Sequence, residues 1–442
     1  MTNCTSSMIA FPACRRRRVE ADFGGGDISS NGGVGLLDLA ERRVGLLSSL
    51  ARRLDDGRQA GKIRHELLPL LRQRVFSVAL GYEDANDHDA LRDDLALQTA
   101  CGRDRRLASA STIGRLDRAA DRSWAWAAHE AMVESFIASF DTPPAELILD
   151  FDATDDAVHG RQEGRFFHGY YDHHCFLPLY VFCGDQLLVS YLRPSNIDGA
   201  KHAWAILALL VKRLRQVWPE VRIILRADSG FCRHKMLSWC ERRDVGYIIG
   251  LAGNVRLHDQ ASMWMAWAKA GYEHTGEKQR LFAELRYGAR SWGKHRRVIA
   301  RLEHGRPKGK KGGANPRYVV TNLGGRGQEL YDGLYCQRGE MENRIKEQQL
   351  DLFADRTSCH KWRPNQFRLI LASLAYNLIE AIRRLALAGT EMARAQAGTI
   401  RLKLLKIGAV ITRNTRRVAI HLSTACPEKA LFTLAVARLK PG

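Results

Sequence analysis

The stretch Leu147-Ile148-Leu149-Asp150-Phe151-Asp152 decides the fold class of this chain. Successive side chains of a strand point to opposite faces of a sheet. Its leucines and phenylalanine therefore share one face, while Asp150 and Asp152 share the other. The stretch follows Pro143-Pro144, where the helical spacing of the preceding residues ends. We predict a strand at the centre of a sheet, with two carboxylates on one of its faces.

The segments that follow have the order of an α/β fold. Two strands of a meander come first, then a helix, a buried strand that ends in a carboxylate, a second helix and a fifth strand. These segments are Tyr170–Phe182, Leu187–Leu192, Lys201–Val217, Val221–Asp228, a helix through Arg242, and Tyr247–Leu251. The order predicts a mixed sheet with helices packed on it.

Basic residues dominate the chain. Its 442 residues include 68 Lys and Arg against 48 Asp and Glu, a formal net charge of +20. Such a surplus indicates a polyanionic partner, most often nucleic acid. Between positions 290 and 317, ten Lys or Arg residues stand against one acid, Glu303. A solvated charge run is the usual explanation, but a nearby tryptophan favours a surface that follows a DNA backbone. The candidate contacts are Trp292, Arg296, Arg297, Lys308, Lys310 and Lys311.

The chain is predicted to divide into six parts. They are a basic, glycine-rich tail with the first helix (1–60), a helical DNA-binding module (61–140), the two parts of the core (141–254 and 326–390), a mainly β insertion between them (255–325), and a basic C-terminal region (391–442). The first 35 residues are expected to be largely mobile, with at most one short strand. In the helical module, Arg115, Arg118 and Arg122 are either phosphate contacts or part of a solvated helix face.

Cysteine spacing and hydropathy indicate the cellular compartment of the protein. The ten cysteines include no C-x-x-C pair, so a structural zinc site is not indicated. The apolar residues near the start precede the arginines, which is the reverse of a signal peptide's order. No run of 18 apolar residues exists to span a membrane. We therefore expect a cytoplasmic protein with reduced thiols.

The stretch Tyr335-Cys336-Gln337-Arg338-Gly339-Glu340-Met341-Glu342-Asn343-Arg344-Ile345-Lys346 is predicted to begin a helix that runs to about Phe353. Tyr335, Arg338, Glu342, Lys346 and Gln349 recur at helical spacing and share one face. Because this face is aromatic and charged, it is not a core stripe. Its carboxylate belongs either to a helix ion-pair ladder or to a metal site whose neighbours hold phosphate.

Three carboxylates are placed to form one site. Asp152 lies in the central strand, Asp228 ends a later strand, and Glu342 lies on the helix after the insertion. Each alone has an ordinary role, such as capping a helix. Together they fit Mg²⁺, which prefers oxygen ligands. Two such ions about 3.5–4 Å apart activate the attacking group and stabilise the leaving oxygen in phosphodiester cleavage.

These residues carry a resemblance to a known family. Asp152-Ala153-Thr154, Asp228-Ser229-Gly230-Phe231 and Tyr335-x-x-Arg338-x-x-x-Glu342 resemble the DDE transposases of bacterial insertion sequences, and most closely the insertion-sequence thirteen-eighty family. The likeness covers nearly the whole chain from about Val19. It extends through Gly81–Asp87, Leu107–Ser109, Val158–Gly160 and Leu404–Gly408.

The resemblance implies a ribonuclease H-like core with a mainly β insertion, and catalysis by Asp152, Asp228 and Glu342. It implies cleavage with two Mg²⁺ ions, which Mn²⁺ can replace, at the element's terminal inverted repeats. The freed 3′ hydroxyl is then joined to target DNA. It also implies double-stranded DNA as the partner, a homodimer that pairs two ends, and a bacterial cytoplasm. In such enzymes Tyr335 and Arg338 would contact phosphate, and an insertion tryptophan, here Trp292, would stack on a flipped base.

Two positions depart from the family pattern or leave it open. The family has a Lys seven residues after the Glu, where this chain has Gln349; Lys346, one turn nearer, is the alternative. Asp150 shares a strand face with Asp152 and is either a second metal ligand or the true first carboxylate. Two other functions stay open, namely a ribonuclease H-like nuclease that cuts without joining and a DNA-binding repressor with a vestigial site.

Overall fold

The computed structural model describes residues 8–305 and 313–440. Their contacts form two compact units. The sheet unit comprises Trp124–Leu350 and Ala354–Ser373. The terminal unit comprises the described residues up to Ser123, Asp351–Phe353, and those from Leu374 onward. No helix among the described residues is both long and apolar enough to cross a membrane.

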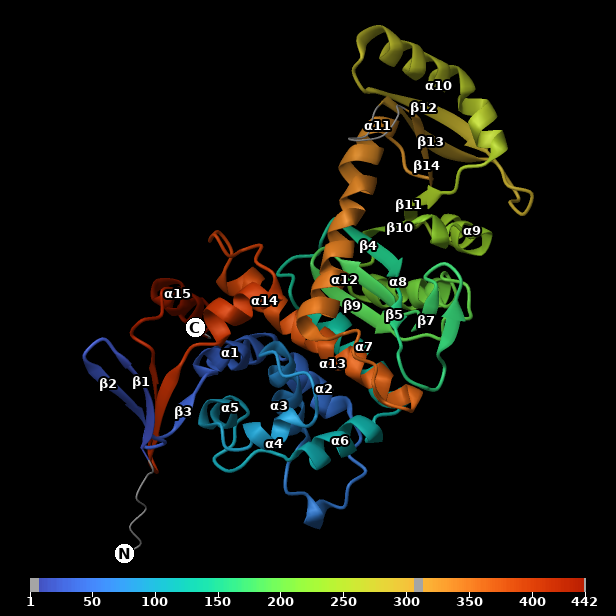
Figure 1. Cartoon of the computed structure of the whole chain (residues 1–442). Helices are drawn as coiled ribbons and strands as arrows, with labels where there is room; N and C mark the ends of the chain where they lie inside the picture. Colours follow the sequence, from blue (N-terminus) through green and yellow to red (C-terminus); the bar gives the residue numbers. More distant parts are fainter. Residues whose placement is uncertain (1–7, 306–312, 441–442) are drawn as a thin grey trace, which may run out of the picture. The chain divides into compact units, whose positions relative to one another are not determined.

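The sheet unit is built on one mixed sheet (Figure 1). Its order is β12-β13-β14-β11-β10-β4-β8-β9. Strands β4, β10 and β11 are parallel to one another, and all other neighbours are antiparallel. The bounds are β4 Glu146–Ala153, β8 Leu179–Cys183, β9 Gln186–Tyr191, β10 Arg222–Ala227, β11 Gly246–Leu251, β12 Gln279–Tyr287, β13 Arg296–Gly305 and β14 Gly313–Thr321. The predicted mixed sheet with helices is confirmed.

One detail of the predicted strands was wrong. The segment Tyr170–Phe182 is not one strand, because Pro178 cannot donate a ladder hydrogen bond and separates β7 (His173–Phe176) from β8. Strand β7 instead lies between β5 (Asp156–Ala157) and β6 (Phe166–His168) in a small second sheet. The insertion supplies the three strands β12, β13 and β14. They extend the central sheet through β14, which pairs with β11.

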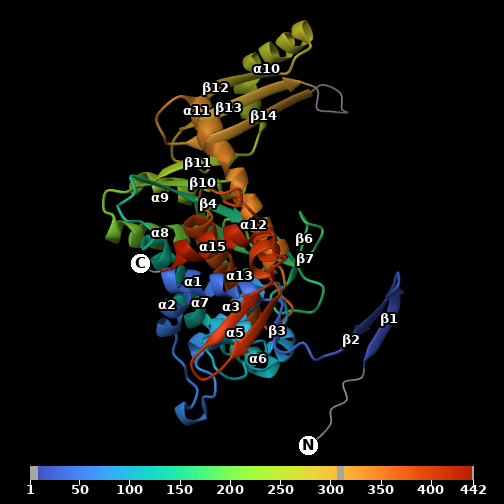
Figure 2. The same ribbon diagram turned by 90° about the vertical axis from the view of Figure 1, so that its left-hand side faces the viewer.

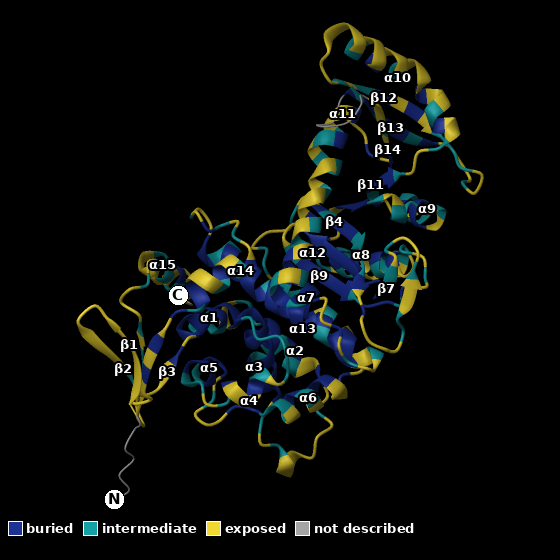
Figure 3. Ribbon diagram, viewed as in Figure 1, coloured by how far each residue is buried: buried dark blue, intermediate teal, exposed yellow. Residues whose placement is uncertain are grey.

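Both faces of the central sheet are covered. Helices α7 (Arg122–Ile137), α8 (Ala203–Val217), α9 (His234–Arg242) and α10 (Val255–Thr275) contribute to the larger core, which Leu147, Leu149 and Phe151 join from β4. The opposite face holds a smaller core of Ile224, Ile248, Ile299, Val319, Leu323 and Tyr331. Figure 3 shows the middle strands in the dark blue of buried residues. The alternation predicted for the central strand is therefore confirmed, and its carboxylates lie on the face of the smaller core.

A long helical segment passes over that face. It begins with α11 (Gly327–Glu329), continues as a π-helix, η4 (Leu330–Tyr335), and a 3₁₀ turn, η5 (Cys336–Arg338), and becomes regular in α12 (Gly339–Leu352). Figures 1 and 2 both show α12 beside β4. The predicted helix is confirmed, but its first turn is irregular. Helix α13 (Trp362–Ala381) follows, and its Gln366 side chain bonds both Leu192 N and Ser190 O beside β9.

The terminal unit brings the two ends of the chain together. Its helices are α1 Gly35–Val44, α2 Leu46–Arg53, α3 Leu67–Ala79, α4 Asp87–Leu91, α5 Leu95–Ala100, α6 Ala110–Ala119, α14 Ala397–Ile400 and α15 Lys429–Leu439. Strands β15 (Ala409–Arg413) and β16 (Val418–Leu422) form the predicted basic pair, and β3 (Ile28–Ser29) joins them. Ranges from both ends of the chain share this unit, and the division into six parts stays a prediction.

The tail prediction was wrong for the described residues. They contain a β-hairpin, β1 (Ile9–Cys14) and β2 (Arg17–Ala21), in addition to β3. The glycine-rich tract is also ordered, because Gly32 and Gly33 are buried against the backbone near Leu404. A Cβ on Gly33 would lie 1.8 Å from Leu404 O and 2.8 Å from Leu405 Cα. These glycines permit a close approach of two chain segments rather than motion.

Replacing Gly33 with alanine is expected to lower the free energy of unfolding by about 3 kcal/mol or more, since only backbone atoms surround the new methyl group. Urea unfolding measures the change. Gly35→Ala is the matched control, because nothing lies within 4 Å of its Cβ position and its φ of −55° suits alanine. Equal stability of the two variants would contradict this packing.

Candidate active site

Asp152 lies near the end of β4, on the face that α12 covers. Its Oδ1 accepts a hydrogen bond from Ala153 N at 2.9 Å. Its side chain is 14% exposed. The carboxylate is therefore nearly enclosed but opens at the carboxyl edge of the strand.

Asp228 lies at the same edge. Strand β10 runs parallel to β4 with Ala227 opposite Phe151, so the next residues, Asp228 and Asp152, end neighbouring strands. Asp228 also caps the 3₁₀ turn η3 (Ser229–Phe231), because its Oδ1 accepts a hydrogen bond from Gly230 N at 2.9 Å. Asp228 therefore caps a turn and also lies at the sheet edge next to Asp152.

Arg338 connects the third carboxylate to the first. Its Nη2 lies 2.5 Å from Glu342 Oε1 and its Nη1 lies 3.4 Å from Asp152 Oδ2. The Glu342 side chain is 44% exposed, whereas that of Arg338 is 18% exposed. The helix ion pair considered from the sequence is thus present. It also reaches across to the sheet, which a simple surface ladder does not do.

The negative charges of Asp228 and Glu342 act on Asp152. The pKa of Asp152 is raised to about 7, mainly by burial; Arg338 opposes the rise, and the charges of Asp228 and Glu342 add to it. Like charges raise a carboxyl pKa in this way only at short range. Within residues 8–305 and 313–440, no three carboxylate, imidazole or thiol groups stand close enough to share one metal ion. The guanidinium of Arg338 lies between two of the carboxylates.

Tyr335 completes the edge. Burial raises its pKa to about 12, with Arg338 opposing and the charge of Asp228 adding to the rise. A Cβ on Gly250 in β11 would lie 2.7 Å from both the Tyr335 hydroxyl and Ser229 N. The glycine therefore lets the tyrosine reach the backbone beside Asp228. The sequence reasoning missed Gly250, although a glycine inside an apolar strand is itself a signal of close approach.

Asp150 forms a buried ion pair with Arg226. Its two oxygens accept hydrogen bonds from Arg226 at 2.5 and 2.7 Å, and Arg226 also donates to Leu334 O at 2.6 Å. Asp150 is 3% exposed and Arg226 6%. The expectation that Asp150 is a second ligand or the first carboxylate is therefore corrected. Its pair with Arg226 is buried and fixes the segment before Tyr335.

Replacing Asp150 with alanine is expected to destabilise the fold by about 3–5 kcal/mol, because Arg226 would be left buried without a counter-charge. Urea unfolding measures this loss. The double variant Asp150→Leu, Arg226→Met is the control, since replacing both charges by apolar groups restores much of the stability. A single variant as stable as the unmodified chain would contradict the structural role.

The predicted DNA contacts of the insertion have other partners in the structure. Arg296 is 4% exposed and bonds Glu241, and Arg297 bonds Glu284. Trp292 is half-buried and packs edge-on against Tyr287 at 5.6 Å. These three side chains therefore have intramolecular partners, and their role as DNA contacts stays a prediction. The predicted contacts Lys308, Lys310 and Lys311 lie outside the described residues.

The position seven residues after Glu342 faces the sheet. Gln349 Nε2 donates to Asp155 O at 3.1 Å, just beyond β4. Lys346 is exposed on α12. The structure thus gives Gln349 a backbone contact next to the site and leaves Lys346 open to solvent, where its proposed role stays a prediction.

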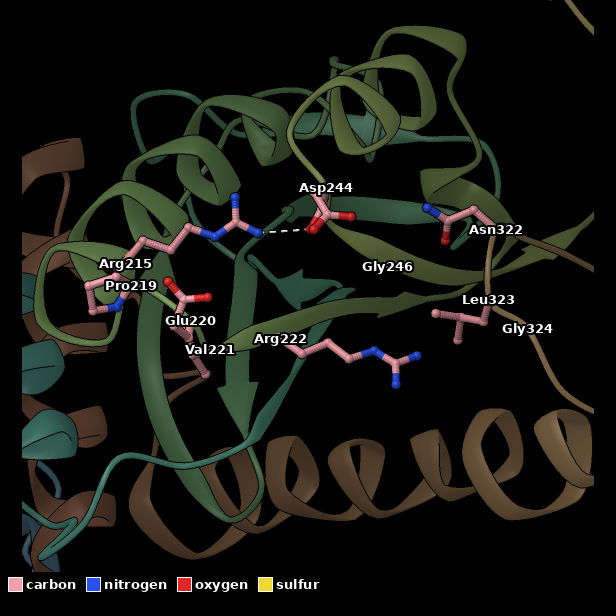
Figure 4. A pocket seen from close by; sticks show the side chains of 10 residues that line it. All are labelled: Arg215, Pro219, Glu220, Val221, Arg222, Asp244, Gly246, Asn322, Leu323 and Gly324. Atoms are coloured by element: carbon pink, nitrogen blue, oxygen red, sulfur yellow. Dashed lines mark hydrogen bonds between the residues drawn. The ribbon is translucent and has the colours of Figure 1, made fainter.

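A pocket of about 600 Å³ lies elsewhere on the sheet unit (Figure 4). Arg222 and Gly246, the first residues of β10 and β11, line it together with Arg215, Asp244 and Asn322. Arg215 donates to Asp244 O at 2.8 Å. Because Asp228 follows the other end of β10, this pocket is at the opposite edge of the sheet from the three carboxylates.

Comparisons with known proteins identify the family of the chain. A family model described as transposase DDE domain, group 1, matches residues 11–441. A search of the curated proteins gives no match. A cryo-EM structure of the piggyBac transposase synaptic complex with hairpin DNA is similar, with a TM-score of 0.43 and 10% identity over 90% of this chain and 82% of that chain. The narrower likeness to the insertion-sequence thirteen-eighty family stays a prediction. By the match over nearly its whole length, the chain belongs to the DDE transposase family, group 1.

Proposed function

We propose that this transposase cleaves DNA at the terminal inverted repeats of its element and joins the freed 3′ ends to target DNA. The observation that carries the proposal is that Asp152 and Asp228 lie at the same ends of neighbouring parallel strands, while Arg338 contacts both Asp152 and Glu342. The strand order β9-β8-β4-β10-β11, in which only β8 runs opposite to the other four strands, supports a ribonuclease H-like core.

The donor set fits divalent magnesium. All three groups offer carboxylate oxygens. Burial is the main cause of the raised pKa of Asp152, and the charges of Asp228 and Glu342, which a cation would neutralise, add to it. We assign the ligands as Asp152, Asp228 and Glu342. Two Mg²⁺ ions, replaceable by Mn²⁺, would supply Lewis-acid chemistry at the scissile phosphate and the attacking hydroxyl.

Arg338 and Tyr335 hold the DNA in this proposal. A guanidinium offers two parallel donors that match phosphate oxygens, and once the carboxylates bind cations it is free to turn to DNA. Tyr335, with its pKa raised to about 12, keeps its proton at neutral pH and donates a hydrogen bond to phosphate. Both side chains orient the scissile strand against the three carboxylates.

DNA ends are bound outside the catalytic edge in this proposal. The net charge of +20 favours duplex DNA as partner. Arg115 and Arg118 on α6 and Arg122 at the start of α7 are exposed, which supports their role as phosphate contacts of the 61–140 module. The basic C-terminal region contributes further contacts, and a homodimer pairs two ends.

A strand-transfer assay separates a transposase from a nuclease that only cuts. Precut duplex ends with a free 3′ hydroxyl are incubated with the full chain, Mg²⁺ and a supercoiled target plasmid. Joined products that are absent with Asp228→Asn support the proposal. Cleavage of uncut ends without any joining would favour the nuclease, and end binding without cleavage or joining would favour the repressor.

A further inference from the structure

Residues 166–176 form a second feature of the sheet unit, which we name the aromatic hairpin. It consists of β6, the turn at 169–172 and β7. Eight of its eleven residues carry an aromatic or imidazole ring. Four of these rings are exposed to solvent. They are His174 and three larger apolar rings, with exposed fractions of 42% for Phe166, 55% for Phe167 and 85% for Tyr170. Figure 3 shows exposed ribbon at β7. Large rings gathered at one exposed place indicate a binding surface.

The hairpin is held firmly at its base. Ser195 donates its hydroxyl hydrogen bond to Phe166 O at 2.8 Å, and Val158 N donates to His174 O at 2.9 Å. The Cys175 and Phe176 side chains are fully buried. The exposed rings are therefore presented by an ordered backbone, which lowers the entropy that a ligand must remove on binding.

Several contacts place the hairpin at the catalytic edge. Strand β5, which pairs with β7, begins four residues after Asp152. His173 Nε2 lies 2.9 Å from Asp155 Oδ2, and the carbonyl of the same aspartate accepts the hydrogen bond from Gln349 on α12. Burial and the charges of Asp155 and Asp152 raise the pKa of Tyr171 to about 12. The hairpin is thus close to the catalytic carboxylates.

The chemistry of the exposed rings selects one part of a DNA substrate. Phe166 and Phe167 have no polar group with which to bind a phosphate. Bases inside a duplex are covered by their neighbours, whereas an unpaired base offers a free π-face on which aromatic rings stack. A DNA end held at the three carboxylates brings such bases within reach of the hairpin.

Resting on the proposed function, we propose that the aromatic hairpin stacks on an unpaired base of the DNA end bound at the catalytic carboxylates. Phe167 and Tyr170 are the stacking residues. Phe167 packs edge-on against His174 at 5.7 Å, and Tyr170 packs edge-on against Tyr171 at 5.0 Å. Exposed fractions of 55% for Phe167 and 85% for Tyr170 leave much of each ring accessible to a base. Both are positioning residues and take no part in bond breaking.

A thermodynamic cycle tests the contact. The affinity of the full chain for inverted-repeat ends is measured with single abasic sites placed in turn near the cleavage position, for the unmodified chain, Phe167→Ala and Tyr170→Ala. At one position, loss of the ring and loss of the base are each expected to weaken binding by about 5- to 100-fold. Together they weaken it no more than either alone, because they remove the same contact. Tyr170→Phe should retain affinity.

Trp267→Ala is the matched control, since Trp267 is 58% exposed on α10. It should show no coupling to any base. Additive effects at every position, with normal end cleavage, would overturn the stacking proposal alone. Weaker self-association of Phe167→Ala without a loss of DNA affinity would assign the hairpin to a protein partner instead. Failure of the unmodified chain to bind ends would overturn the proposed function and this inference with it.

Discussion

Asp228→Asn is expected to lower end cleavage by roughly 10³-fold or more, because the loss of a metal-binding carboxylate removes several kcal/mol of transition-state stabilisation. The asparagine oxygen can still accept the hydrogen bond from Gly230 N, so the turn after β10 should remain intact. We therefore expect normal folding and normal end binding together with lost cleavage. Gel-based cleavage and a mobility-shift assay measure the two properties on the same DNA.

Asp244→Asn is the matched control for this result. Asp244 is exposed and precedes β11, at the opposite edge of the same sheet. Its φ of +50° is a conformation that asparagine tolerates well. The same change of charge should leave cleavage within about twofold, since it is remote from the proposed metal ligands. Equal losses in the two variants, or retained cleavage in Asp228→Asn, would remove Asp228 from the catalytic set.

Asp152→Asn is expected to be inactive and yet more stable than the unmodified chain at pH 8 in EDTA. The pKa of Asp152 is raised from 3.8 to about 7 in the folded protein. Between those values the folded state binds a proton that the unfolded state has released. Stability is therefore lost as pH rises from about 4 to 7. Asparagine carries no such charge, so the variant should gain about 1–3 kcal/mol at pH 8.

The gain in stability of Asp152→Asn should depend on pH and on the presence of Mg²⁺. At pH 4 the difference between the two proteins should be small, because the aspartate is protonated in the folded state and pH 4 is close to its unfolded pKa of 3.8. Adding Mg²⁺ at pH 8 should stabilise the unmodified chain more than the variant, since a ligand that binds only the folded state adds to its stability. Asp244→Asn again serves as the control. A variant less stable than the unmodified chain at pH 8 would contradict the charge crowding at this edge.

Much of the fold followed from local pattern. The alternation in Leu147–Asp152 and the apolar run before Asp228 indicated two strands of one mixed sheet, and the structure pairs these strands directly. The pairing of β3 with β15 was not predicted, because it joins residues almost 400 positions apart. The burial of Gly33 depends on the same distant contact. The glycine-rich tract was predicted to be mobile, whereas in the structure Gly33 allows two chain segments to pack closely.

The site was predicted less completely for a similar reason. Asp150 and Asp152 share a strand face, and only the position of Arg226 on the neighbouring strand separates a buried ion pair from an open carboxylate. Arg296 and Arg297 belonged to a basic run that suggested DNA, but their partners Glu241 and Glu284 come from other elements. A count of charges in one segment does not show which of them are neutralised across the fold.

End-specific cleavage is the measurement that tests the central claim most directly. The full chain and Glu342→Gln are incubated with Mg²⁺ and duplex DNA that carries the element's inverted repeats. Glu342 is 44% exposed, so the substitution should not disturb folding. We expect nicks at the repeat boundary with the unmodified chain and none with the variant. Equal nicking by both proteins, or binding without cleavage in either Mg²⁺ or Mn²⁺, would contradict catalysis by these three carboxylates.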